Sequence, residues 1–316
     1  MSLRVLQTSL LSLIVDAGRR GLMHKGITPS GPMDWFAYDI NNRLLANAHD
    51  SACIEIHQGE LLFESGTSMT CAATGYGVMV GVNGQEKSSW APFSISKGDT
   101  VSIKTTSEGK VAYFGIADGV DAPTTYDSRC TVMREQVGGL ANQGQPLCSG
   151  DILTQGNARL NQISIGLFNV NKLMALVEYM YQSRPLRVSA GNQLAVLGRK
   201  AWATLLCGEY RLTAEHSRMG SRLVGPPLCR RSVSMRSEGL VQGSIQVPPN
   251  GQPIIMNADH QTMGGYPKLA NVCRIDWPLF ASMPIDSSIC FVESDTAQAR
   301  FLLQHTLQQI DSCFNR

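Results

Sequence analysis

Residues 237–272, SEGLVQGSIQVPPNGQPIIMNADHQTMGGYPKLANV, combine strand formers, turn formers and an unusual set of polar side chains. A short strand is predicted over 245–247, and the Pro-Pro-Asn-Gly run at 248–251 predicts a turn. A second strand over 254–256 leads into the polar run 257–261 and a Gly-Gly-Tyr-Pro turn. The stretch therefore predicts a pair of strands whose rim carries a site, with an ordinary polar surface loop as the alternative.

This stretch resembles the KipA family, also called the allophanate hydrolase subunit 2 or carboxyltransferase A/B family, which includes the C subunit of bacterial ATP-dependent 5-oxoprolinase. The family pattern reads S-E-G-V-x-x-G-x-I-Q-V-P, then G-x-P-I, then D-x-Q-T-T-G-G-Y-P. The chain matches it at Ser237, Glu238, Gly239, Gly243, Ile245, Gln246, Val247, Pro248, Gly251, Pro253, Asp259, Gln261, Thr262, Gly264, Gly265, Tyr266 and Pro267. Agreement at so many positions is far more specific than a short motif.

Two further blocks carry the same resemblance. Residues 16–34 are similar to D-x-G-R-x-G…G-V-x-x-S-G-A-M-D, and residues 217–228 are similar to S-D-R-M-G-Y-R-L-x-G-P-x-L. The departures from the family's patterns are Ser217 in place of aspartate, Gln145 in place of arginine, Met263 in place of threonine, Asn192 in place of proline, Asp118 in place of glycine, and Cys130 within a G-S-R-S-T-like segment. Loss of a carboxylate and an arginine predicts altered substrate choice or lost turnover, so the chain is identified as a divergent member.

Composition is typical of a globular protein. Hydrophobic residues make up 43% of the 316 residues and charged residues only 16%, which excludes disorder as the main state. The 27 basic residues are offset by 25 acidic ones without any basic run, so nucleic-acid binding is not expected. The nine cysteines are scattered and no run approaches a membrane span, which predicts reduced thiols and a cytoplasmic location.

Strand periodicity dominates the chain and predicts closed or sandwiched β-structure. One helix is predicted from the N-cap Asp34 to Asn47, and another after the cap Asp295, whose apolar stripe suits core packing. The resemblance sharpens this to a mainly β fold of two tandem cyclophilin-like β-barrel subdomains with a few peripheral helices, including a C-terminal helix. The expected division is 1–168, the N-terminal β-barrel, and 169–316, the C-terminal β-barrel with its helix.

Motifs for self-sufficient catalysis are absent from the sequence. No phosphate-binding loop, dinucleotide fingerprint, H-E-x-x-H or G-x-S-x-G occurs, and no bound metal is predicted. Of the histidines, His57 and His305 are expected to be structural or exposed, whereas His24 and His260 lie inside the family blocks and are candidates for lining a cleft.

The resemblance implies a chemistry in which ATP phosphorylates the oxygen of a cyclic amide and water then attacks the activated carbon. That calls for cations and N–H groups around phosphate, a base near the water and a partner for the amide. The predicted catalytic residues are Asp259, Gln261 and Glu238, the predicted substrate-binding residues are Arg19, Ser30, Arg218 and Tyr266, and the predicted cofactor-binding residues are Gly264, Gly265 and Lys268.

Each of these polar residues also has a structural interpretation. Asp16 and Asp34 are further candidate bases, but Asp34 is most simply a helix cap. Arg19 and Arg218 are equally suited to buried ion pairs, and Glu238 to binding turn backbone. Turn chemistry alone also explains Ser30.

Three function classes are open. The first is a component of ATP-dependent 5-oxoprolinase, with ATP shared with partner subunits: a KipI-like B subunit, two copies of each being one arrangement, and a LamB/YcsF-like A subunit. The second is the carboxyltransferase component of a biotin-dependent urea/allophanate-type system, with biotin attached to another chain. The third is a KipA-like regulatory protein that antagonises a kinase inhibitor. In each case the isolated chain is expected to be inactive as an enzyme.

Overall fold

The computed structural model describes residues 2–156, 168–228 and 235–314 and divides the chain into two compact units. Unit 1 consists of Met1–Arg19, Ser30–Met174 and Ser312–Arg316, and unit 2 of Arg20–Pro29 and Ala175–Asp311. The chain thus passes between the units four times. The division at residue 168 expected from the sequence stays a prediction.

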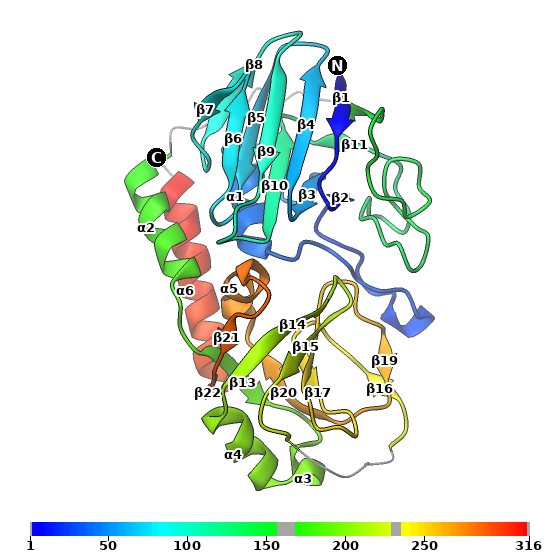
Figure 1. The fold of residues 1–316 in the computed structure, drawn as a ribbon, viewed down its shortest axis with the longest axis vertical. Coiled ribbons are helices and arrows are strands. Elements are labelled where there is room, and N and C mark those ends of the chain that lie inside the picture. Colours follow the sequence, from blue (N-terminus) through cyan, green and yellow to red (C-terminus); the bar gives the residue numbers. More distant parts are fainter. Residues whose placement is uncertain (1, 157–167, 229–234, 315–316) are drawn as a thin grey trace. The chain divides into compact units, whose positions relative to one another are not determined.

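Unit 1 is built on two antiparallel sheets (Figure 1). Within the described residues, the larger has seven strands in the order β11 (Val120–Asp121), β12 (Ile152–Gln155), β1 (Ser2–Gln7), β4 (Glu60–Ser65), β9 (Thr100–Lys104), β6 (Met79–Val82) and β7 (Gln85–Lys87). The smaller has five in the order β2 (Leu11–Val15), β3 (Cys53–His57), β10 (Val111–Ile116), β5 (Met69–Thr74) and β8 (Pro92–Ile95).

The core of unit 1 lies between these sheets, because alternate residues of each strand face inward. Phe63 of β4 and Phe114 of β10 stack there with ring centroids 5.0 Å apart, and both are fully buried. The strands β6 and β7 are joined by Asn83 and Gly84, whose φ angles of 52° and 76° fit the two-residue hairpin turn that an Asn-Gly pair predicts.

Helix α1 (Trp35–Leu44) starts where the sequence predicts. Its N-cap is Asp34, whose Oδ1 accepts hydrogen bonds from the backbone N–H groups of Phe36 and Ala37, each at 3.0 Å. This confirms the predicted cap. The loop before the helix is held by the fully buried carboxylate of Glu55, which accepts from Met33 N at 2.8 Å.

Two aromatic side chains also contact the carboxylate of Glu55. Tyr113 donates to Oε2 at 2.6 Å, and His57 Nε2 lies 2.6 Å from Oε1. Burial, and then the charge of Glu55, raise the pKa of Tyr113 well above its ordinary value, so the phenol stays a donor. The predicted structural role of His57 fits this network.

The described residues of unit 2 form one large mixed sheet (Figure 1). In the described part of the unit it has eight strands in the order β21 (Ser288–Ile289), β14 (Tyr210–His216), β15 (Gly220–Val224), β18 (Ile254–Met256), β17 (Ser244–Gln246), β20 (Lys268–Val272), β13 (Leu186–Ala190) and β22 (Phe291–Glu293). A separate pair, β16 (Glu238–Gly239) and β19 (Met263–Gly264), forms a small flap.

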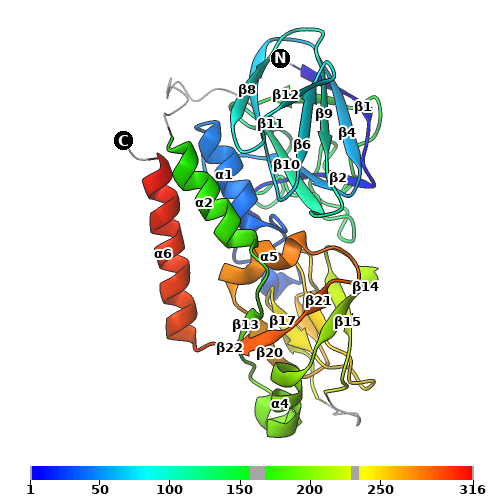
Figure 2. The same ribbon diagram turned by 60° about the vertical axis from the view of Figure 1, so that its left-hand side comes forward.

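Helices lie outside the sheets, as predicted. They are α2 (Val170–Tyr181), α3 (Leu194–Leu197), α4 (Arg199–Cys207), α5 (Trp277–Ser282) and α6 (Thr296–Phe314), with short 3₁₀ turns η1 (Met23–Lys25) and η2 (Arg274–Asp276). In both views α2 and α6 run alongside each other (Figures 1 and 2). The mainly β fold with two β units and a C-terminal helix is therefore confirmed.

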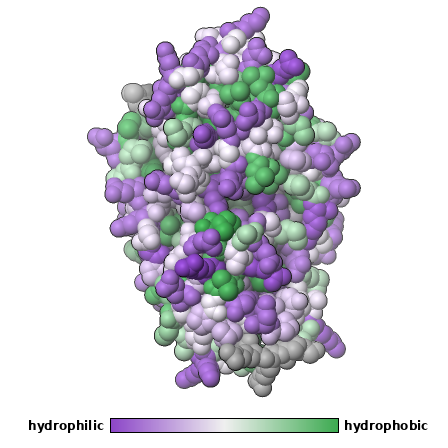
Figure 3. Space-filling model, viewed as in Figure 1, coloured by the Kyte–Doolittle hydropathy of each residue, from purple (hydrophilic) through white to green (hydrophobic). Residues whose placement is uncertain are grey.

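The C-terminal helix is capped as predicted, since Asp295 Oδ1 accepts from Gln298 N at 2.7 Å. Its apolar stripe is only partly used for packing. Ile310 is fully buried, whereas Leu307 is 38% exposed. Phe301, on the same helix, is 66% exposed. On the face drawn in Figure 3, apolar side chains are scattered among hydrophilic ones.

In the described ranges no helix combines the length and apolarity that a membrane span needs. In the same ranges no three His, Cys, Asp or Glu side chains are grouped so that they could hold a metal ion.

Lys110, directly before β10, is expected to destabilise unit 1 at neutral pH. Its Nζ is buried without a hydrogen-bond partner among the described residues, and desolvation lowers its pKa to about 8. Because this pKa lies below the unfolded value of about 10.4, the unfolded chain binds more protons between these two pH values, so stability rises with pH there. Lys110→Met should therefore raise the free energy of unfolding by on the order of 1 kcal/mol near pH 7.

Urea denaturation at several pH values measures this effect, with the exposed Lys104→Met as the control. The gain from Lys110→Met should shrink toward pH 10, where the folded protein holds the amine neutral and no longer buries a charge. A loss of stability at pH 7, or a gain equal to that of the control, would contradict the assignment.

Candidate functional site

A pocket of about 440 Å³ lies within unit 2, at the small end of the usual range for ligand sites. It is formed by β14, β15, β17 and β18 together with the segments that follow β14 and β18. The lining residues are Ala214, Glu215, His216, Ser217, Met219, Gly220, Arg222, Gln246, Ile254, Met256, Gln261 and Tyr266.

The alternation of side chains along the strands explains which residues reach the pocket. Arg222 of β15 pairs with Ile254 of β18, and Gly220 pairs with Met256, and all four line it. The intervening Ile255 is fully buried on the other face. At the rim, Arg222 Nε and Glu215 Oε2 form an exposed ion pair at 2.7 Å.

Gln246 is the most deeply buried polar side chain of the pocket, with 1% of its surface exposed. Its Nε2 donates to the backbone carbonyl of Tyr266 at 3.1 Å, while Oε1 has no partner among the described residues. The partly exposed Gln261 also lines the pocket. The pocket therefore offers a fixed acceptor and a second amide that can both donate and accept.

Gly264 of β19 makes room for these two amides. A Cβ at this position would lie 2.5 Å from Gln246 Nε2, 2.8 Å from Leu240 Cδ1 and 3.2 Å from Gln261 Nε2. No such crowding exists at Gly239, on the facing strand of the same flap, where a Cβ would meet nothing within 4 Å.

Gly264→Ala is consequently expected to displace Gln246 and Gln261 and to lower ligand affinity at the pocket about tenfold or more, because a 1 Å displacement of a positioning group is already costly. Gly239→Ala is the matched control and should change affinity little. Titration calorimetry of the wild-type chain and both variants with a small cyclic amide measures the difference. Equal effects of the two substitutions would show that the space beside Gln246 is unimportant.

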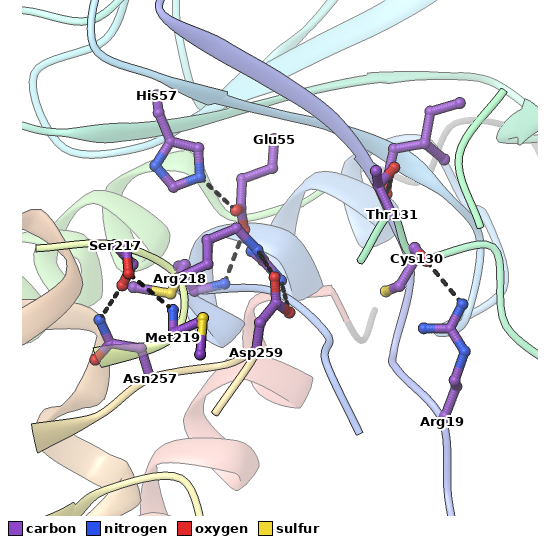
Figure 4. Close-up of polar contacts among 12 residues, drawn as sticks. Arg19, Glu55, His57, Cys130, Thr131, Ser217, Arg218, Met219, Asn257 and Asp259 are labelled. Carbon is purple, nitrogen blue, oxygen red and sulfur yellow. Dashed lines mark hydrogen bonds and ion pairs between the residues drawn. The ribbon is translucent and has the colours of Figure 1, made fainter. Parts of the chain in front are cut away.

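Arg218 and Asp259 are brought together by the structure, although 41 positions separate them (Figure 4). Arg218 lies in the β14–β15 turn and Asp259 follows β18, and both are 6% exposed. The guanidinium of Arg218 donates two hydrogen bonds of 2.8 Å to the carboxylate of Asp259, from Nε to Oδ2 and from Nη2 to Oδ1. The backbone N–H of Asp259 also donates to the Arg218 carbonyl. This is the ion-pair interpretation left open for Arg218, and neither side chain lines the pocket.

Glu238 and Lys268 form a second ion pair, at the base of the flap. Lys268 Nζ lies 3.2 Å from Glu238 Oε2 and donates to the Gly239 carbonyl at 2.9 Å, while Gln193 Nε2 donates to the same Glu238 oxygen at 2.7 Å. A phosphate group would reach the ammonium of Lys268 only by displacing Glu238. Gly265, beside this flap, is exposed.

The candidates of the N-terminal block lie in unit 1. Arg19 is 2% exposed and donates through Nη2 to the Cys130 carbonyl at 2.8 Å (Figure 4). Its Nε donates to the Thr125 carbonyl at 3.2 Å. The carboxylate of the nearby Asp16 accepts from the Ser128 hydroxyl and the Cys130 thiol. Ser30 has a φ of 55°, which fits a turn position. The contacts of Arg19 and Asp16 give these two residues structural roles within unit 1.

Of the predicted site residues, Gln261 and Tyr266 line the pocket. His260 is 2% exposed and does not line it, and its Nδ1 lies 2.8 Å from the Gln261 carbonyl. His24 is an exposed residue of η1. The functional roles proposed for all these residues stay predictions.

Sequence reasoning missed the pocket residues His216 and Gln246 as functional candidates. Gln246 was recognised only as part of the family pattern, yet its place next to the inward-facing Ile245 already predicts a side chain on the opposite face of the strand. His216 carried no comparable signal, because its position depends on the irregular pairing of β14 with β15.

Comparisons with known proteins agree with this architecture. The chain is 28% identical over 300 residues to the C subunit of 5-oxoprolinase from Escherichia coli, covering 94% of this chain and 93% of that protein. It is 30% identical over 291 residues to the C subunit of 5-oxoprolinase from Haemophilus influenzae, covering 91% and 89%. The solved structure of Kluyveromyces lactis urea carboxylase shares the fold with a TM-score of 0.86 at 22% identity, over 98% of this chain and 29% of that one.

The profile of the family described as "Carboxyltransferase domain, subdomain A and B" matches residues 25–293. This range contains most of unit 1 and all eight described strands of the unit 2 sheet, together with the pocket and the flap. The chain belongs to the family of the carboxyltransferase domain, subdomain A and B.

Proposed function

We propose that the chain is a component of an ATP-dependent 5-oxoprolinase, which converts 5-oxo-L-proline, ATP and water into L-glutamate, ADP and phosphate. The observation that carries this proposal is its similarity to two proteins named as the C subunit of 5-oxoprolinase, over about nine tenths of their length. Their names also imply an assembly of several subunits.

The pocket of unit 2 suits a cyclic amide. A lactam has one N–H donor and one carbonyl acceptor, held in a cis arrangement by the ring. Gln246 Oε1 is a buried acceptor for the N–H, and the Gln261 amide can donate to the carbonyl oxygen. The apolar side chains of Ile254 and Met256 give the ring methylene groups a surface on which to pack.

Hydrolysis of an unstrained lactam is unfavourable, so ATP has to activate it. Transfer of the γ-phosphoryl group to the lactam oxygen leaves ADP, and attack of water on the ring carbon, with loss of phosphate and cleavage of the C–N bond, gives glutamate. These steps need cations around the phosphates. Lys268, predicted for this task, is held by Glu238 and Gly239, and Arg218 is held by Asp259.

We therefore assign amide binding to this chain and propose that partner subunits contribute to phosphate binding and proton transfer. The proposed partners are a KipI-like B subunit and a LamB/YcsF-like A subunit, and the location is cytoplasmic. Co-purification of the tagged chain with these proteins tests the assembly.

The functional test is glutamate formation from 5-oxo-L-proline and ATP, measured for the chain alone and after addition of both partners. Activity is expected only in the complete mixture. Turnover by the purified chain alone would contradict a shared site, and an intact complex without turnover would contradict the 5-oxoprolinase assignment.

A second candidate follows from the family description itself. A carboxyltransferase role would require transfer of a carboxyl group from carboxybiotin on another chain to a urea-type amide, which would also suit an amide-binding pocket. Biotin-dependent carboxylation of urea in the same complex, without glutamate formation from 5-oxo-L-proline, would establish this alternative.

A further inference from the structure

Arg222 is the only lysine or arginine among the described residues that line the pocket of unit 2. Its side chain is 45% exposed and forms an ion pair with Glu215, from Nε to Oε2 at 2.7 Å. In the described ranges no other side chain forms an ion pair with the guanidinium. Because Glu215 contacts Nε, the edge formed by Nη1 and Nη2 can bind a carboxylate with two parallel N–H···O bonds.

Arg222, Ile254 and Gln246 form a row across three neighbouring strands. Arg222 of β15 pairs with Ile254 of β18, which pairs in turn with Gln246 of β17. Directly paired residues share one face of a sheet, and all three line the pocket. Neighbouring strands lie about 4.8 Å apart, so two strand spacings place the Cα atoms of Arg222 and Gln246 about 10 Å from each other. The row therefore holds a cation and a buried amide acceptor on opposite sides of one apolar side chain.

A lactam that carries a carboxylate on the ring carbon next to its nitrogen matches this row. With its N–H on Gln246 Oε1 and its ring against Ile254, the carboxylate is attached beside the nitrogen and can extend toward Arg222. The long arginine side chain spans the remaining distance from its strand. The three residues thus correspond to the three chemical parts of such a ligand: amide, ring and anion.

We propose that Arg222 binds the carboxylate of the ligand, so that the pocket selects anionic amides with a carboxylate beside the amide nitrogen. This inference rests on the proposed function for the amide-binding role of Gln246. Urea, the substrate of the second candidate function, is uncharged and offers the guanidinium no anionic group. The position of Arg222 therefore favours 5-oxo-L-proline over a neutral, urea-type amide.

Two lactams that differ by a single carboxylate test this selectivity. The wild-type chain should bind 5-oxo-L-proline about tenfold or more tightly than 2-pyrrolidinone, because hydrogen bonds between charged groups are stronger than those of neutral groups. Only the affinity for 5-oxo-L-proline should fall when salt is added. Titration calorimetry of the full chain at two salt concentrations gives both results.

Arg222→Met should abolish the selectivity. The affinity for 5-oxo-L-proline should fall about tenfold or more and lose its salt dependence, while the affinity for 2-pyrrolidinone stays unchanged. The variant is expected to fold like the wild type, because an exposed ion pair contributes little to stability. Arg211→Met is the matched control, since Arg211 is an exposed residue of β14 that does not line the pocket. This control should leave both affinities unchanged.

The outcomes separate this inference from the proposed function. Equal affinities of the wild-type chain for the two lactams would keep the amide pocket and overturn the role of Arg222. The same conclusion follows if Arg222→Met weakens both lactams equally, or if it has no more effect than Arg211→Met. A wild-type chain that binds neither lactam would contradict the assignment of amide binding to this chain, and the role of Arg222 with it.

Discussion

Asp259→Ala is expected to lower the free energy of unfolding by about 3–5 kcal/mol, because it leaves the guanidinium of Arg218 buried without the carboxylate that binds it at two points. The backbone bond from the N–H of residue 259 to the Arg218 carbonyl is kept in this variant, so the loss reports on the side-chain pair. Urea denaturation of the purified chain gives the measurement.

The double substitution Arg218→Met with Asp259→Leu is the informative control. Removing both charges leaves neither member of this pair without the other, so the double variant should recover much of the stability lost by Asp259→Ala. A catalytic Asp259, as the sequence predicted, would behave differently: Asp259→Ala would then unfold like the wild type and lose activity in the assembled enzyme.

The local structure of the segment 237–272 could be predicted well from its residues. The predicted strand over 254–256 is β18, and the Pro-Pro-Asn-Gly turn closes with a bond from Gly251 N to Pro248 O of 2.9 Å. These features depend on alternation and turn chemistry, which act over a few residues. The Asp34 cap and the C-terminal helix were predictable for the same reason.

The candidate site was predictable only in part, because it depends on contacts between distant segments. Gln261 and Tyr266 were found through their place beside the Gly-Gly turn. The pairing of Arg218 with Asp259 and the contact of Gly264 with Gln246 depend on the order of strands in the sheet. Periodicity carries no information about that order, so the sequence could not separate an ion pair from a catalytic pair.

Gln246→Leu is expected to cause the largest loss of activity, lowering kcat/KM for 5-oxo-L-proline in the assembled enzyme by about 100-fold or more. The substitution removes the buried acceptor proposed for the lactam N–H and leaves a polar substrate group unpaired. It also removes the bond to the Tyr266 carbonyl, which holds the exit of the Gly-Gly turn.

Two variants separate these effects. Gln246→Glu keeps an acceptor and loses the donor to Tyr266, so it should retain more activity than leucine if the acceptor matters. Gln242→Leu lies on the exposed turn before β17 and should leave kcat/KM unchanged. Activity of Gln246→Leu within a factor of two or three of wild type would exclude a role for this amide in substrate binding.

The location of bound 5-oxo-L-proline tests the central claim most directly. It can be determined from a crystal structure of the assembled complex soaked with saturating 5-oxo-L-proline in the absence of ATP. The lactam is predicted to lie in the unit 2 pocket, with its N–H on Gln246 Oε1 and its ring against Ile254 and Met256. Lactam bound elsewhere in the complex, with this pocket empty at saturation, would contradict the assignment of amide binding to this chain.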